Sequence, residues 1–260
     1  MTGLFDSHAH LADPRFDGDA AEVMARMAEA GVEGCVIIGD GAADPEPALA
    51  MAARFPLFFA AVGVHPHDAS LFSDEAFSRV KGWLARDKVV ALGEIGLDFH
   101  YDHSPRSAQI AAFEAQLDCA RDMGLPTIMH VREAHGEATR MLSERSGRLP
   151  RGVMHCYTGS WESAKWYMDK GLYISLSGAV TFKNAPKLRE VASKIPIDRL
   201  LIETDCPYLA PVPMRGRRNE PAFVAYVAEA IARIRGVDAG DIADATRENA
   251  RRLFGIPLPA

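Results

Sequence analysis

Histidines and carboxylates recur at the ends of short apolar segments in this 260-residue chain, beginning with the stretch DSHAH near the amino terminus. His8 and His10 stand one residue apart there. Further candidates follow at wider spacing: His65, Glu94, His130, His155 and Asp205. Imidazole nitrogens and carboxylate oxygens form borderline N/O sites that suit zinc, manganese or magnesium. These residues can form one site only if the fold brings them together.

The apolar segments form a regular pattern along the chain. Short β-branched runs bounded by Gly, Pro or Asp alternate with longer stretches of helical period. Eight runs are typical of strands: GLFDSH, VEGCVIIG, LFFAAVGVHP, VVALGEIGLD, LPTIMHV, GVMHCYTG, LYISLSG and RLLIETDCPY. Their spacing of roughly 20 to 35 residues is the repeat length of parallel strands joined by helical crossovers. Helices are indicated over 19–31, 73–87, 104–124, 221–235 and 238–254.

This repeat predicts an α/β fold, a (β/α)₈ TIM barrel with an additional C-terminal helix. No linker or low-complexity segment interrupts it, so we expect a single domain over residues 1–260. A doubly wound open sheet is the alternative. It would normally carry a glycine-rich phosphate loop after the first strand, where this chain has DSHAHLAD.

If the fold is a barrel, functional residues are expected at the carboxyl ends of the strands, where the active sites of such barrels lie. Every candidate falls at such an end. Residues two apart on a strand face the same way, so His8 and His10 are expected to project together toward the barrel axis. A single strand histidine is more often a hydrogen-bonded core residue than a ligand. The shared rim therefore favours a metal centre over unrelated core histidines.

Composition and charge narrow the function classes. The formal charge of −6 argues against a passive nucleic-acid binder, which would usually be basic. No segment approaches the roughly 18 apolar residues of a membrane span, and the amino terminus lacks a signal-peptide pattern, so we expect a soluble cytoplasmic protein. The four cysteines are scattered, which favours buried, reduced thiols over a thiolate zinc site or a disulfide framework.

The motifs that surround these residues resemble those of the TatD family of metal-dependent deoxyribonucleases, within the wider amidohydrolase-type barrels. The matching segments are FDSHAHL, GVHPH, GEIGLDFHYDHSPRSAQIAAFEAQLDCA, PTIMHVREA, HCYTGS, SLSGAVTFK, LLIETDCPYLAP and RGRRNEP. They run in family order from Phe5 to Pro221, so the resemblance covers nearly the whole chain. Many amidohydrolase relatives carry a bridging carbamylated lysine on the fourth strand, where this chain offers Glu94.

The resemblance implies a centre of two divalent ions (Mg²⁺, Mn²⁺ or Zn²⁺). One ion would be held by His8, His10, Glu94 and Asp205, and the other by Glu94, His130 and His155. A water or hydroxide between the ions would be the nucleophile. Glu94 would bridge the ions, and Asp205 would orient the nucleophile and accept its proton, with a purely ligating role as the alternative for Asp205.

Charge explains why such a centre suits phosphate. Two divalent cations, two carboxylates and one hydroxide leave a net charge of about +1, which favours an anionic phosphodiester and its transition state. An acidic chain can therefore still act on nucleic acid.

Other residues are predicted to handle the substrate. The resemblance suggests that His65 contacts a phosphate oxygen, with support of a metal ligand as the alternative. Arg217 and Arg218 lie in a basic loop after the last strand, which can hold a phosphate backbone, although a solvated loop is as common. Asn219 then serves as a cap for the following helix, with Pro221 in its first turn.

Three further residues are expected to have lesser roles. Glu203 faces the same way as Asp205 one layer deeper, so supporting a ligand is favoured over direct catalysis. Asp6 is also expected to face inward and support the ligands. His67 lies in a loop where a solvated position is at least as common. No role is assigned to His100 or His103.

These observations favour a nuclease that cleaves DNA, at single-stranded or frayed ends, because a barrel mouth admits a strand end more readily than the side of a duplex. The alternative is hydrolysis of another ester or amide bond, as in a D-aminoacyl-tRNA deacylase. A non-catalytic metal-dependent binding protein is the third class, against which a complete ligand set argues. Nucleic acid is the expected partner, with no membrane and no obligate protein partner.

Overall fold

The computed structural model describes residues 3–145 and 147–257. Its strands form a single parallel sheet in the order in which they occur along the chain. They are β1 (Leu4–Ala9), β2 (Val32–Asp40), β3 (Phe58–Gly63), β4 (Val89–Asp98), β5 (Thr127–Arg132), β6 (Gly152–Met154), β7 (Tyr173–Leu176) and β8 (Leu200–Ile202). Each coincides with one of the eight predicted strand segments.

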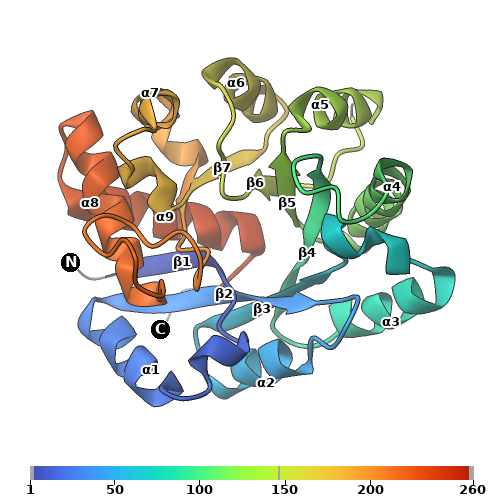
Figure 1. Ribbon diagram of the computed structural model, residues 1–260, viewed down its shortest axis with the longest axis horizontal. Coiled ribbons are helices and arrows are strands. Elements are labelled where there is room, and N and C mark those ends of the chain that lie inside the picture. Colours follow the sequence, from blue (N-terminus) through green and yellow to red (C-terminus); the bar gives the residue numbers. More distant parts are fainter. Residues whose placement is uncertain (1–2, 146, 258–260) are drawn as a thin grey trace.

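Helices surround this sheet on its outer side (Figure 1). They are α1 (Ala20–Glu29), α2 (Glu46–Arg54), α3 (Asp74–Leu84), α4 (Arg106–Met123), α5 (His135–Glu144), α6 (Trp161–Asp169), α7 (Pro186–Lys194), α8 (Val224–Arg235) and α9 (Ala239–Phe254). The last of them follows the eighth strand–helix unit. The prediction of a TIM barrel with an additional C-terminal helix is confirmed.

The sheet closes on itself between β1 and the segment that follows β8. Ala9 and Cys206 form a parallel bridge. The backbone amide of Asp205 donates to the carbonyl of His8 (3.0 Å), and the amide of His10 donates to the carbonyl of Cys206 (2.8 Å). Residues from the two ends of the chain therefore lie side by side at the barrel rim.

A buried carboxylate reinforces this closure. Asp6 accepts hydrogen bonds from the backbone amide (2.9 Å) and the hydroxyl (2.5 Å) of Thr204, and from the amide of His8 (3.3 Å). Burial raises the pKa of Asp6 to about 7. Asp6 thus faces inward as expected, but it holds the backbone next to Asp205 and makes no hydrogen bond to a ring of the candidate metal ligands.

The barrel interior below the rim is apolar. Ile128 lies two residues before His130, and Val153 lies two residues before His155, so each pair shares one face of its strand. Ile128 and Val153 belong to a buried cluster that includes Phe254 at the end of α9. The additional helix therefore contributes to the packing beneath the candidate site.

Helix hydropathy and the state of the cysteines bear on two expectations about the whole chain. None of the helices within the described residues is both long and apolar enough to span a bilayer. The four cysteines are free thiols, and three of them are buried. Burial raises the pKa of Cys35 and Cys206 well above the ordinary value.

Candidate metal centre

Glu94 lies at the middle of the candidate site, on the inner face of β4. Its Oε1 lies 2.7 Å from His155 Nε2 and 2.8 Å from His130 Nδ1. These two ring nitrogens are 3.2 Å apart. His65 Nε2 approaches the same oxygen at 3.3 Å. One carboxylate oxygen on β4 therefore faces three imidazoles, which come from the carboxyl ends of β3, β5 and β6.

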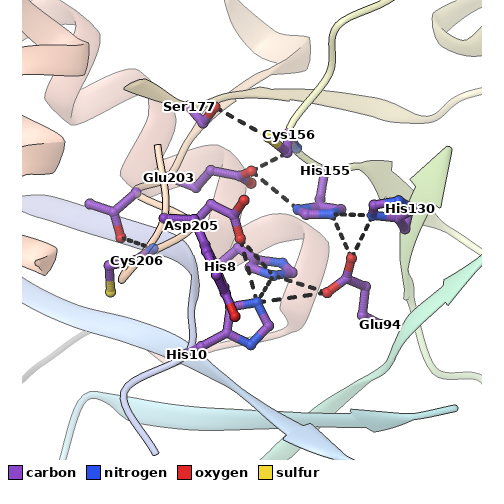
Figure 2. Close-up of polar contacts among 12 residues, drawn as sticks. His8, His10, Glu94, His130, His155, Cys156, Ser177, Glu203, Asp205 and Cys206 are labelled. Carbon is purple, nitrogen blue, oxygen red and sulfur yellow. Dashed lines mark hydrogen bonds and ion pairs between the residues drawn. The ribbon is translucent and has the colours of Figure 1, made fainter. Parts of the chain in front are cut away.

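The second oxygen of Glu94 faces the first strand. Oε2 lies 3.4 Å from His8 Nε2 and 3.8 Å from His10 Nε2. The two ring nitrogens are 3.2 Å apart, which confirms that the two imidazoles of DSHAH project together toward the barrel axis. Asp205 Oδ1 lies 3.7 Å from His8 Nε2 and 3.4 Å from His10 Nε2. Figure 2 shows the two oxygens of Glu94 pointing to these separate groups.

The donor atoms fit divalent cations. Three overlapping groups have ligand atoms close enough to share an ion: His8, His155 and Asp205; His8, His10 and Glu94; and His65, Glu94 and His130. Ring nitrogens that face one another across about 3 Å can direct their lone pairs at a common point. The ligand atoms of these groups are nitrogen and oxygen only. Such donors suit zinc, manganese or magnesium. Glu94 belongs to two of the groups, as a bridging residue must.

Two of the imidazoles are oriented by buried carboxylates on their far side. The Nε2–H of His130 donates to Asp98 Oδ2 (3.1 Å), and the Nδ1–H of His155 donates to Glu203 Oε1 (3.2 Å). Because each proton is placed on the far nitrogen, the near nitrogen keeps its lone pair for a cation. The geometry agrees with the supporting role predicted for Glu203.

Asp98 is a residue of the candidate site that the sequence did not single out. It is the last residue of β4 and is fully buried. Besides His130 it accepts hydrogen bonds from His67 Nε2 (2.9 Å) and from the backbone amides of His100 (3.0 Å) and Tyr101 (2.9 Å). The solvated position expected for His67 is wrong, since its ring is held by Asp98. The spacing of four residues from Glu94 was the available signal, because both positions share one face of an extended strand.

A glycine between the two carboxylates lets β4 adopt this path. Gly96 has φ +143°, and a Cβ there would collide with the carbonyl oxygen of His130. The ladder between β4 and β5 is irregular between Leu92 and Ile95, the part of β4 that contains Glu94. Only glycine permits β5 to approach closely enough for His130 to reach both Glu94 and Asp98.

Asp205 is held by the backbone just after β8. Its φ of +56° lies in the left-handed region, which Asp tolerates better than most residues. Its amide donates to the carbonyl of His8, and its carbonyl accepts from the amide of Tyr208 (3.0 Å). Its side chain is 13% exposed, compared with 6% for Glu94. Asp205 is thus the more accessible of the two carboxylates.

The surrounding imidazoles keep both carboxylates ionised. Burial by itself raises the pKa of Glu94, but His155 and His65 outweigh it, and the pKa lies well below its usual range. The same balance applies to Asp205, whose pKa is lowered by its contact with His10 despite burial. Both groups are therefore anionic at neutral pH, as cation ligands must be.

Comparison with known proteins agrees with this geometry. The profile of the family described as "TatD related DNase" matches residues 5–255. The chain belongs to this family. It is 45% identical over 253 residues to the uncharacterized metal-dependent hydrolase YabD of Bacillus subtilis (strain 168), covering 97% of this chain and 99% of that protein. As a member of the TatD family, the chain is a metal-dependent hydrolase.

Two further relatives cover the full length. A protein of Enterobacter lignolyticus (strain SCF1) named 3'-5' ssDNA/RNA exonuclease TatD is 38% identical over 260 residues, covering 98% of this chain and 100% of that one. The crystal structure of YJJV, a TatD homologue from Escherichia coli K12, superposes with a TM-score of 0.91 at 33% identity over 98% of each chain. The barrel of this chain is thus that of TatD structures.

His65 differs from the other imidazoles of this TatD-family site in the state of its ring. The backbone amide of His67 donates to His65 Nδ1 (3.1 Å), so the neutral ring carries its proton on Nε2. That nitrogen faces Glu94. A donor in this position can bind an oxygen of the carboxylate or of a substrate, which agrees better with the predicted phosphate contact than with metal ligation.

The two arginines of the loop after β8 lie in different surroundings. The Arg218 guanidinium pairs with Asp19 through two hydrogen bonds (2.7 Å each), donates to the carbonyl of Arg15 (2.5 Å) and stacks on Phe16. Arg217 is exposed. A phosphate contact by Arg218 stays a prediction, but its bonds give it a structural role that the sequence did not indicate.

The capping role predicted for Asn219 is wrong. Its side chain is buried and donates to the carbonyls of Thr204 (2.8 Å) and Tyr208 (2.6 Å), while the helical turn Pro221–Phe223 begins after Glu220. Asn219 therefore holds the loop that carries Asp205. Pro221 does open the first turn, as predicted.

Proposed function

We propose that this chain is a nuclease that hydrolyses phosphodiester bonds of single-stranded nucleic acid, most readily DNA, from a free end. The observation that carries the proposal is the position of Glu94, whose two oxygens face two groups of imidazoles. Paired cations on one carboxylate are the arrangement that clamps the attacking and leaving oxygens of an in-line displacement. The full-length relative named 3'-5' ssDNA/RNA exonuclease supports the choice of substrate.

In this proposal the ligands divide as their positions suggest. His8, His10, Asp205 and Glu94 hold one ion, and Glu94, His130 and His155 hold the other. When bound, the ions would supply Lewis acidity and a water that is acidic enough to attack near neutral pH.

The remaining steps belong to side chains of this protein. Asp205, the more exposed carboxylate, accepts the proton of the attacking water at its carboxylate. The Nε2–H of His65 donates to a non-bridging phosphate oxygen, which orients the phosphodiester. Arg217, exposed in the loop after β8, meets the phosphate backbone farther out, while Arg218 keeps that loop against Asp19.

An assay panel tests the proposal. Single- and double-stranded DNA and RNA, labelled at either end, and a D-aminoacyl-tRNA are incubated with Mg²⁺, Mn²⁺ or Zn²⁺. We expect single-stranded DNA to be shortened from one end and the reaction to stop with a chelator. A Glu94→Gln variant purified in parallel is the control for contaminating nucleases.

Intact oligonucleotides with every metal would overturn the nuclease proposal. Release of the amino acid from the D-aminoacyl-tRNA in the same panel would instead assign the site to the ester-hydrolase alternative. The deciding readout is thus which bond the same centre cleaves.

A further inference from the structure

Two exposed tyrosines lie on opposite sides of the barrel mouth. Tyr101 is 50% exposed and follows β4, and Tyr208 is 49% exposed and follows β8. Histidines aside, they are the only exposed aromatic side chains among residues 3–145 and 147–257. In a closed ring of eight strands β4 and β8 lie across from each other, so the two rings flank the centre.

Each tyrosine lies at the edge of the candidate metal centre, and its backbone amide donates to an aspartate there. The Tyr101 ring lies edge-on to His67 (5.6 Å between centroids) and parallel to the exposed His103 ring (5.5 Å), and its amide donates to Asp98. The Tyr208 ring lies edge-on to His10 (5.9 Å), and its amide donates to the carbonyl of Asp205. Both tyrosines are therefore held through their backbone amides beside the candidate centre.

A guanidinium lies over each ring, but the two differ in charge balance. Arg15 lies 4.5 Å from the centre of the Tyr208 ring and is paired with Asp13 (2.6 Å). Arg132 lies 4.6 Å from the Tyr101 ring and forms no ion pair with a carboxylate of the described residues. The adjacent Glu133 is paired with His100. The positive charge of Arg132 is thus available at the mouth.

The position of Arg132 directs this charge toward the centre. It is the last residue of β5, two residues after His130, so both side chains leave the strand on the same face. Arg132 therefore stands one layer above a candidate metal ligand. An unpaired guanidinium there suits a backbone phosphate next to the one being cleaved.

We propose that a single strand of nucleic acid lies across the mouth from Tyr101 to Tyr208, with one base stacked on the parallel rings of Tyr101 and His103, one base stacked on Tyr208, and a flanking phosphate bound by Arg132. The inference rests on the proposed nuclease function and adds the subsites that hold its substrate. Aromatic rings with neighbouring guanidinium groups bind single strands with little sequence preference, since every base has a π face. A duplex offers no unstacked base to such rings.

Substitution of the tyrosines tests the stacking. Tyr101→Leu and Tyr208→Leu should each raise KM for a single-stranded oligonucleotide by about 5-fold or more, and the Phe variants should restore most of the loss. Trp166→Leu is the matched control, because Trp166 lies under a lysine (Lys170, 5.5 Å) on α6, in the outer ring of helices. Its KM should stay that of the wild type.

An abasic substrate separates stacking from a structural effect. With the two terminal bases of the oligonucleotide removed, the penalty of each Tyr→Leu substitution should shrink toward that of the control. A penalty of equal size on intact and abasic strands would overturn the assignment of the tyrosines to bases.

The salt dependence of KM tests Arg132. Loss of one phosphate contact lowers the slope of log(1/KM) against log[salt] by about 0.7 for a single strand. Arg132→Ala should show this change, Arg132→Lys should keep most of the slope, and Lys170→Ala should not alter it. An unchanged slope in Arg132→Ala would contradict the phosphate contact.

These results are distinguishable from failure of the proposed function itself. If the wild type cleaves no nucleic acid, the nuclease proposal fails. If it does and the Tyr→Leu variants keep the wild-type KM, only the location of the strand is wrong.

Discussion

The two groups of imidazoles that meet at Glu94 are held in different ways (Figure 2). His130 and His155 each donate to a buried carboxylate, Asp98 and Glu203 respectively. On the first strand, the Nδ1 of His8 is buried without a hydrogen-bond partner among the described residues. The β5–β6 half of the centre is therefore oriented by side-chain bonds, and the β1 half is not.

The β1 half is held by hydrogen bonds to the backbone of its strand and by ring stacking. The His8 ring lies parallel to that of His155 at 4.0 Å between centroids. Its strand is joined to the segment after β8 through Asp6 and Thr204. Since outer carboxylates raise the affinity of a histidine for metal, we expect the β5–β6 half to bind its ion more tightly than the β1 half.

The largest effect is expected at the residue that both halves share. Glu94→Gln removes the negative charge between the two groups and should lower kcat by more than about 10³-fold, beyond the 10–100-fold typical of an outer partner. Elemental analysis should find fewer than two ions per chain. Full metal content with the wild-type thermal unfolding curve would show that Glu94 does not join the halves.

The second prediction concerns the outer carboxylates themselves. Asp98→Asn and Glu203→Gln should each weaken the tighter step of a metal titration by about 10–100-fold and leave the weaker step nearly unchanged. Glu133→Gln is the matched control, because its partner His100 is not a candidate ligand. If both steps moved together, the two halves would not be independent.

The third prediction addresses the β1 half. Asp6→Ala leaves the buried amide and hydroxyl of Thr204 without their acceptor, which should lower the free energy of unfolding by about 1–3 kcal/mol. Asp6→Asn retains one acceptor oxygen and should cost less. Chemical denaturation measures both. A large loss of metal affinity in a variant of normal stability would mean that Asp6 acts on the ligands directly.

The smallest effect is expected at the edge of the same half. Arg218→Ala removes a partly exposed ion pair with Asp19, the residue before α1, and should lower Tm by about 2 °C or less. Arg217→Ala should instead reduce the salt slope of KM by about 0.7. If Arg218→Ala changed the salt slope by as much, Arg218 would bind phosphate as first predicted.

Strand periodicity and the rim rule were sufficient to predict the barrel and the residues that meet in it. His8, His10 and His130 each lie within 3.8 Å of Glu94, and Asp205 lies within 3.7 Å of His8 and His10, because strand ends in a closed parallel sheet share one rim. Asp98 escaped notice because it is the last residue of the predicted segment VVALGEIGLD, where an Asp was interpreted only as the boundary of the strand.

Contacts between distant segments could not be predicted in this way. The pairing of Arg218 with Asp19 joins the two ends of the chain across the barrel closure, and no local pattern announces it. The ring state of His65 depends on a single backbone amide in the following turn. Such details follow from the exact path of loops, which hydrophobic periodicity does not specify.

The central claim is that Glu94 lies between two cation sites. Anomalous diffraction from crystals of the wild-type protein grown with Mn²⁺ tests it most directly. The account predicts two peaks about 3.5–4 Å apart on either side of the Glu94 carboxylate, one near His130 and His155 and the other near His8 and His10. A single peak at saturating Mn²⁺, or peaks away from Glu94, would contradict it.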